Sequence, residues 1–242
     1  MTSIAGKAVL ITGANRGIGQ ALVEAALARE ASRVYAGTRA PFTHSDTRVV
    51  PVTLDVTSDE QIRAAVDAVG SLDLLINNAG IAGYDDLSDA EVIARHLAVN
   101  LYGTHAVTRA FTPLLARSGG AVVNNLSITA FAPLPLIPSY SISKAAALAL
   151  TQASRTLLEP RGVRVHAVLT GFVDTDMTRG AQSPKATPAS VAEAIFDGVE
   201  QGRDDIFPDA MSRPMADGWR ALASSVLEGR FAALAAELRA AA

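Results

Sequence analysis

Short apolar runs alternate along the chain with longer segments in which apolar residues recur at helical spacing. Each short run predicts a strand, and the runs cover residues 7–13, 33–38, 49–56, 72–80, 120–127 and 164–171. The longer segments predict helices over residues 17–30, 59–70, 89–117 and 139–160. Most of the runs are continuously apolar, which is typical of strands covered by helices on both faces of a sheet. The alternation therefore predicts one doubly wound α/β domain over residues 1–242, with a parallel sheet and right-handed crossovers.

The C-terminal part continues the pattern more weakly. A helix capped by Thr187 is predicted over residues 187–202, followed by a short last strand at 204–209. Residues 215–240 are predicted to form a largely helical tail. We expect its apolar side chains to pack on the domain, with a second subunit as the alternative surface; these are Trp219, Leu222, Val226 and Phe231.

Composition narrows the class of protein. Of the 242 residues, 49% are apolar, which is enough to build a substantial core. The net charge is −3 and no basic stripe occurs, so we expect no nucleic-acid partner. The chain has no cysteine and its four histidines show no ligand spacing, so we expect no metal. The first residues form only a short apolar run, and we therefore expect a cytoplasmic protein with no membrane partner.

A glycine-rich turn follows the first predicted strand and opens the first predicted helix. Its spacing is Gly13-x3-Gly17-x-Gly19. Glycines allow the backbone to turn tightly and approach a phosphate, while the helix N-terminus offers unpaired N–H groups to a pyrophosphate. A tight strand-to-helix turn without a ligand would also need glycine. Because the turn belongs to the first strand–helix unit, we favour dinucleotide binding and include Asn15 and Ile18 of the same turn.

The end of the second predicted strand bears on the choice of dinucleotide. In dinucleotide-binding folds an acidic residue there binds the adenosine ribose of NAD. Here the chain has Thr38 and Arg39, and Arg16 lies in the glycine turn. Arginine binds phosphate bidentately, so this arrangement favours NADP(H) over NAD(H). The alternative is that both arginines are ordinary surface residues.

Taken together, the motifs resemble those of the short-chain dehydrogenase/reductase family. The glycine turn, Asp55 in "LDVTS", "NNAG" at 77–80, Asn100, Ser127 and the pair Tyr140-x3-Lys144 occur in the order and rough spacing of that family. The resemblance covers about residues 5–178. It implies a single Rossmann-type domain that carries both a cofactor site and a substrate site.

The spacing of Tyr140 and Lys144 suggests a chemical role. Residues i and i+4 share one face of a helix. A tyrosine has a pKa near 10, and we expect the lysine cation to lower it. Tyr140 would then exchange a proton with a carbonyl or alcohol oxygen, and Ser127 would donate a hydrogen bond to that oxygen. The resemblance assigns these two roles, and it implies that Lys144 holds the nicotinamide ribose and that Asn100 kinks a helix to hold a water.

The resemblance also implies further cofactor contacts. Asp55 and Val56 would hold the adenine, while Asn78, Ala79 and Gly80 would line the cofactor cleft. The segment 169–177 resembles the family's Pro-Gly segment, although Thr170 stands where proline is usual. Three residues of this segment still match the family pattern, namely Gly171, Val173 and Thr175. The contact with the nicotinamide carboxamide is therefore expected to survive, in a looser turn.

Three departures from the family pattern stand out. Asn125 and Leu126 precede Ser127, where an apolar residue and a serine are common. The segment 39–55 is short, so we expect a turn in place of the usual crossover helix. The chain also lacks the glycine-rich ending that commonly supports tetramers, so a homodimer or a monomer is plausible and a tetramer is less secure.

The substrate is expected to be a small hydrophobic carbonyl compound or the matching alcohol. The expected pocket wall has no basic residue that would hold a carboxylate or phosphate. It consists of Ile81, Ile128, Phe131, Leu134, Leu136, Ile137, Phe172 and Met177, several of which could instead be core residues. Residues 176–190 are predicted to form a mobile lid. The sequence thus favours an NADPH-dependent carbonyl reductase that is reversible as an alcohol dehydrogenase.

Two other functions remain open. A 3-oxoacyl carrier-protein reductase would need a basic docking surface, and the only lysines are Lys7, Lys144 and Lys185, although arginines could serve. A non-catalytic NADP-sensing regulatory protein would keep the fold without turnover. The presence of the whole set of catalytic candidates argues against it.

Overall fold

The described residues form a sheet of seven parallel strands in the order β3-β2-β1-β4-β5-β6-β7. The structure is a computed structural model that describes residues 3–221, 227, 230 and 231. The strands are β1 (Ala8–Thr12), β2 (Arg33–Thr38), β3 (Val49–Thr53), β4 (Leu74–Asn77), β5 (Ala121–Asn125), β6 (Arg164–Val168) and β7 (Asp205–Ile206). The predicted doubly wound fold is confirmed. The strand order reverses between β1 and β4, and ligands of such sheets bind beyond the carboxyl ends of the strands at this position.

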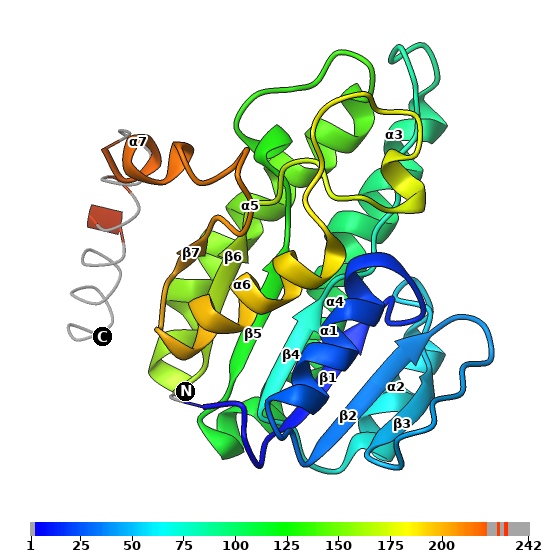
Figure 1. Cartoon of the computed structure of the whole chain (residues 1–242), viewed down its shortest axis with the longest axis vertical. Helices are drawn as coiled ribbons and strands as arrows, with labels where there is room; N and C mark the ends of the chain where they lie inside the picture. Colours follow the sequence, from blue (N-terminus) through cyan, green and yellow to red (C-terminus); the bar gives the residue numbers. More distant parts are fainter. Residues whose placement is uncertain (1–2, 222–226, 228–229, 232–242) are drawn as a thin grey trace, which may run out of the picture.

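Helices cover both faces of the sheet. They are α1 (Gly17–Ala28), α2 (Asp59–Val69), α3 (Ala90–Leu97), α4 (Thr104–Ser118), α5 (Pro138–Leu158), α6 (Pro188–Glu200) and α7 (Met215–Ala221). Helices α1 and α6 lie on one face, and α2, α4 and α5 lie on the other (Figure 1). Strand β1 shows how the sequence builds this sandwich, because Val9 and Ile11 join the first layer and Leu10 joins the second. Burying each such side chain contributes about 1.5–3 kcal/mol.

Arg29, which follows α1, ties that helix to α6. Its guanidinium contacts the carboxylates of Glu193, Asp197 and Glu200 at 2.6, 2.6 and 2.7 Å. It also lies 5.6 Å from the centre of the Phe196 ring. Burial opposes the charge on Arg29, but the hydrogen bonds and charges of Asp197 and Glu193 outweigh it and raise its pKa. This cluster holds the two helices of one layer in a fixed relation.

Two predictions about the elements had different outcomes. No helix forms between β2 and β3, as the short segment there predicts. The helix predicted over 89–117 occurs but is not regular, because α3 and α4 are joined by a π-helix at Ala98–Gly103. A π-helix needs one extra residue per turn, and apolar periodicity alone does not reveal it.

The tail is helical where the structure describes it, in α7. Trp219 is buried as predicted, stacks on Phe131 at 4.5 Å between ring centres, and donates to the Asp205 carboxylate at 2.9 Å. Phe231 is 63% exposed, so the prediction that it packs on the domain is wrong. Leu222 and Val226 lie outside the described residues. Among the described helices, none has the length and apolar character needed to cross a membrane.

Candidate active site

The glycine turn lies at the carboxyl end of β1 and has the backbone that the sequence predicts. Gly13 and Gly17 adopt φ angles of +66° and +54°, a region that favours glycine. Helix α1 begins after Arg16, and no side chain of the part of the chain that the structure describes caps its N-terminus. Its first N–H groups are therefore available to an anion. The turn fits a dinucleotide pyrophosphate.

The end of β4 is bonded directly to this turn. Thr12 Oγ1 accepts hydrogen bonds from the backbone N–H groups of Asn78 and Ala79, each at 3.0 Å. Asn78 Nδ2 donates in return to the carbonyl oxygens of Thr12 and Gly13 at 3.0 and 3.3 Å. The "NNAG" segment is thus both a strand-ending turn and a wall next to the glycine turn. Thr12 was not among the predicted site residues, although its position directly before Gly13 could have indicated that it belongs to the site.

Asn100 lies inside the π-helix and is 1% exposed. Its Oδ1 accepts from the Ile81 N–H, and its Nδ2 donates to the Ile81 carbonyl and to Ser143 Oγ, all at 2.9 Å. Ser143 Oγ donates in turn to the Tyr140 carbonyl at 2.7 Å. Asn100 therefore joins the segment after β4 to the start of α5. The predicted helix irregularity at Asn100 is confirmed.

Gly80 lies where Asn100 and Lys144 converge. A Cβ atom built on Gly80 would lie 3.2 Å from Asn100 Oδ1 and 3.8 Å from Lys144 Nζ. Lys144 Nζ donates to the Asn125 carbonyl at 2.7 Å, and it has no other hydrogen-bond partner among the described residues. An ammonium has three donors, so Lys144 has capacity for further acceptors such as ribose hydroxyls. This donor set fits the nicotinamide ribose.

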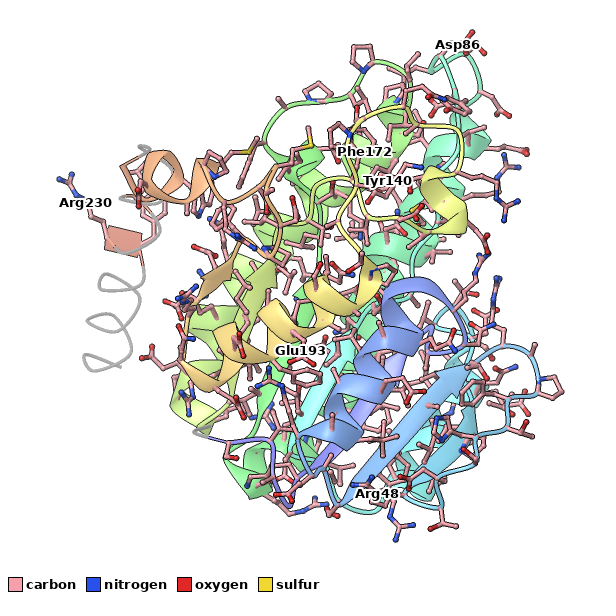
Figure 2. The ribbon with its side chains drawn as sticks, in the orientation of Figure 1. Arg48, Asp86, Tyr140, Phe172, Glu193 and Arg230 are labelled. Atoms are coloured by element: carbon pink, nitrogen blue, oxygen red, sulfur yellow. The ribbon has the colours of Figure 1, made fainter. Side chains whose placement is uncertain are left out.

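Tyr140, Ser127 and Lys144 meet at the same end of the sheet. Lys144 Nζ lies 5.6 Å from the centre of the Tyr140 ring, as expected for residues one helical turn apart. Ser127 follows β5, is 6% exposed, and accepts hydrogen bonds from the N–H and hydroxyl of Thr129 at 3.2 and 3.1 Å. Tyr140 lies beyond the carboxyl ends of the strands, in the same part of the molecule as Phe172 (Figure 2).

The expected lowering of the Tyr140 pKa by Lys144 is wrong for this structure. Burial raises the pKa of Tyr140 to about 12, and a hydrogen bond with Ser127 acts in the opposite direction without cancelling it. Burial also lowers the pKa of Lys144 to about 8. Lys144 Nζ lies 5.6 Å from the centre of the Tyr140 ring, and desolvation outweighs charge attraction there. Tyr140 is consequently a neutral phenol at neutral pH.

The end of β2 is polar, as predicted for an adenosine site. Thr38 is buried and donates to the Ala40 carbonyl at 2.7 Å, whereas Arg39 is exposed. Burial favours a higher pKa for Asp55, but hydrogen bonds from Thr57 and the charge of Arg39 outweigh it and lower that pKa. The side chain of Val56 is 8% exposed and belongs to the core, so its predicted contact with an adenine stays a prediction.

The remaining residues of the glycine turn differ in their surroundings. Asn15 is exposed, and Ile18 packs partly against the core. Arg16 forms an ion pair with Asp176 at 3.2 Å, so a 2′-phosphate would compete with this carboxylate. A cleft of about 820 Å³ lies beside Gly17 between α1 and the segment 174–189, but none of the four catalytic candidates lines it.

Side-chain hydrogen bonds hold the loop after β6. Thr170 Oγ1 donates to the Leu126 carbonyl at 3.0 Å, and the Gly171 N–H donates to Asp209 Oδ2 at 2.8 Å. Asp209 Oδ1 also accepts from the N–H groups of Met211 and Ser212 at 3.0 and 2.9 Å. These bonds hold the turn in place, and the expectation that it is looser than the family's Pro-Gly turn stays a prediction. Asp209 was missed because it lies 38 residues from Gly171 and matches no local motif.

This loop returns to the glycine turn. Val173 is buried and forms a bridge with Ala186, and Thr175 Cγ2 lies 3.1 Å from a Cβ atom built on Gly17. The last residues of the segment predicted as a lid, 176–190, belong to a helix, because Thr187 caps α6 and residues 188–190 form its first turn; the lid itself stays a prediction.

The expected substrate wall divides into three groups. Phe131 packs against Trp219 and Phe207, so its ring belongs to the C-terminal core. Leu136 and Met177 are 61% and 52% exposed. Residues of the wall that are half-buried are Ile81, Ile128, Leu134, Ile137 and Phe172. Among the described residues, no group of three acidic, histidine or cysteine side chains is placed to hold a metal ion.

Comparison with known proteins agrees with this geometry. The sequence model of the short chain dehydrogenase family matches residues 7–186. The chain is similar to a short chain dehydrogenase of Aspergillus terreus, with 32% identity over 85% of this chain and 49% of the relative. The chain thus spans about half the length of that relative.

Two solved structures are similar along most of their length. A short chain dehydrogenase from Burkholderia cenocepacia, in complex with NADP, is 39% identical with a TM-score of 0.86, covering 94% of this chain and 98% of that one. A 3-ketoacyl-(acyl-carrier-protein) reductase from Brucella melitensis, complexed with NADH, is 25% identical with a TM-score of 0.72, covering 80% and 90%. The chain belongs to the short-chain dehydrogenase/reductase family and is an oxidoreductase of that family.

Proposed function

We propose that the protein reduces a hydrophobic ketone or aldehyde to the alcohol, with NADPH as cofactor, and that it catalyses the reverse oxidation under alkaline conditions. The observation that carries this proposal is the convergence of Tyr140 and Ser127 with Lys144 beside the glycine turn. When bound, the cofactor supplies the hydride. The half-buried apolar side chains near Tyr140 would hold the carbon skeleton of the substrate.

The proton chemistry favours reduction at neutral pH. With a pKa of about 12, Tyr140 keeps its proton and can donate it to the oxygen of a carbonyl as that oxygen gains negative charge. Ser127 would donate a hydrogen bond to the same oxygen. The ammonium of Lys144, 5.6 Å from the ring centre, would stabilise the phenolate that remains.

The first experiment mixes the protein with NADPH and a panel of aryl ketones and follows the absorbance of the reduced cofactor. Turnover would separate an enzyme from a cofactor-sensing regulatory protein. For Tyr140→Phe we expect near-complete loss of turnover with NADPH binding retained. If that variant keeps its rate, Tyr140 is not the proton donor.

Preference for NADPH is supported by Arg39 at the adenosine end and by the NADP-bound relative from Burkholderia cenocepacia. The relative complexed with NADH supports no such preference. We expect Arg39→Asp to weaken NADPH far more than NADH. Equal effects on the two dissociation constants would exclude a phosphate role for Arg39.

Reduction of a 3-oxoacyl thioester is the second candidate, and the similarity to the reductase from Brucella melitensis favours it. Comparing kcat/KM for acetoacetyl-coenzyme A with that for the best aryl ketone decides between them. A ratio strongly in favour of the thioester would select this alternative.

A further inference from the structure

We propose that Asn125 binds the nicotinamide riboside half of the cofactor, accepting a hydrogen bond from it through the side-chain oxygen Oδ1. The inference rests on dinucleotide binding by the protein and not on the identity of its substrate. It concerns a position where the sequence departs from the family pattern by carrying an amide in place of an apolar side chain.

Asn125 lies between two parts of the candidate cofactor site. It is the last residue of β5 and stands two residues before Ser127. Its backbone carbonyl accepts a hydrogen bond from Lys144 Nζ at 2.7 Å. Its side-chain Nδ2 donates to Asn78 Oδ1 at 3.0 Å. One residue thus contacts both the lysine that would hold the ribose and the wall of the cofactor cleft.

The alternation of side chains along β5 separates Asn125 from its neighbour Asn124. Asn124 points to the opposite face of the sheet, where it bonds Asn77 and Thr151 at 2.9 Å in the buried interior. Its polar atoms are all used there. Asn125, in contrast, shares its face of the sheet with Asn78 and the glycine turn.

The hydrogen-bond network determines which side-chain atom Asn125 leaves unpaired. Asn78 must use its nitrogen toward the carbonyl oxygens of Thr12 and Gly13, because these accept and cannot donate. Asn78 Oδ1 is therefore the atom that faces Asn125. Because this oxygen accepts, Asn125 must donate to it through its side-chain nitrogen. The amide orientation of Asn125 is fixed through this chain of bonds, and Oδ1 is left over as an acceptor.

Asn125 Oδ1 is buried and has no hydrogen-bond partner among the described residues. Leaving such an acceptor unpaired costs about 1–3 kcal/mol, and an apolar side chain at this position would avoid the cost. The nicotinamide riboside carries the donors that would satisfy it, namely ribose hydroxyls and the carboxamide NH₂. Asn77 Oδ1 is also buried and unpaired, but Asn77 bonds Thr108 and Asn124 in the interior.

The test compares two ligands by isothermal titration calorimetry. NADPH contains the nicotinamide riboside, whereas 2′,5′-ADP contains only the adenosine half with its 2′-phosphate. For Asn125→Val we expect the dissociation constant of NADPH to rise about 5- to 10-fold, as loss of one hydrogen bond implies. We expect the dissociation constant of 2′,5′-ADP to stay within about twofold of the wild-type value. Asn125→Ala serves as a second variant that introduces no added bulk.

A matched control separates direct contact from an effect on the glycine turn. Asn78→Ala removes the bonds to Thr12 and Gly13 as well as the partner that orients Asn125, so it should weaken 2′,5′-ADP as well as NADPH. If the Asn125 variants behave like Asn78→Ala, or leave NADPH unaffected, direct contact by Asn125 is excluded. A protein that binds NADPH with the expected pattern but reduces no ketone or thioester would refute the proposed function and support this inference. Failure of the wild-type protein to bind any dinucleotide would overturn both.

Discussion

Gly19 is the position where the smallest change should have the clearest effect on the cofactor site. A Cβ atom built there would lie 2.0 Å from the backbone oxygen of Gly13 and 2.7 Å from Asn78 Nδ2. Ordinary van der Waals contact begins at 3.4 Å, so the first of these contacts is about 1.4 Å too short. The clash is with the backbone, and no side-chain rotation relieves it. Gly19→Ala must therefore push the start of α1 away from the glycine turn.

This displacement should affect both the stability of the protein and its affinity for NADPH. Overpacking of a tightly packed site costs about 1–3 kcal/mol of the free energy of unfolding. The N–H groups at the start of α1 would move with the helix by an amount comparable to the overlap. Hydrogen bonds to charged groups are worth about 1.5–3 kcal/mol each, so weakening one of them corresponds to about a 10- to 100-fold loss of NADPH affinity.

The assay is a fluorescence titration with NADPH combined with thermal denaturation. Gly218→Ala in α7 is the matched control, because nothing lies within 4 Å of the added Cβ atom. We expect the control to bind NADPH like the wild type and to be unchanged or slightly more stable, since alanine favours helix more than glycine does. If Gly19→Ala binds NADPH within about twofold of the wild type, with an unchanged melting temperature, the argument from backbone contact is wrong.

Three further predictions follow from charges and burial. Arg29→Met should lower the free energy of unfolding by about 1.5–3 kcal/mol, measured by urea denaturation, because α6 loses the partner of three carboxylates; an unchanged midpoint would contradict this. Burial lowers the pKa of His166, whose Nδ1 bonds the Arg203 carbonyl at 2.6 Å, so stability is full above the ordinary histidine pKa of 6.5 and should fall as the pH drops below it. His166→Asn should flatten the dependence of the free energy of unfolding between pH 7 and pH 5, and an equally steep curve would exclude this histidine. Because the pKa of Lys144 is about 8, kcat/KM for reduction should fall above about pH 8 as the cation beside Tyr140 is lost, and a flat profile to pH 10 would contradict that role.

The main features of the fold follow from local patterns. Continuous apolar runs separated by amphipathic segments are sufficient to predict parallel strands with helical crossovers, and all seven strands occur where expected. The predictions fail where the local periodicity of apolar residues carries no information about the backbone. The π-helix around Asn100 is favoured by bonds from Asn100 to Ile81 and Ser143, residues 19 and 43 positions away.

The features of the candidate site are also of two kinds, those determined by short segments and those determined by contacts between distant segments. The positive φ angles of Gly13 and Gly17 and the proximity of Tyr140 to Lys144 are properties of short segments, and the sequence determined them. Asp209, by contrast, reaches Gly171 only because β6 and β7 are adjacent in the sheet.

The protonation states were decided by tertiary structure alone. Spacing along α5 places an ammonium one turn from the phenol, and this by itself predicts a lowered pKa for Tyr140. The folded protein buries Lys144 and half-buries Tyr140, and desolvation raises the pKa of Tyr140 and lowers that of Lys144. The sequence thus determined which groups meet, whereas burial by distant segments decided which of them carry a charge, because the cost of removing a charge from water depends on everything that surrounds it.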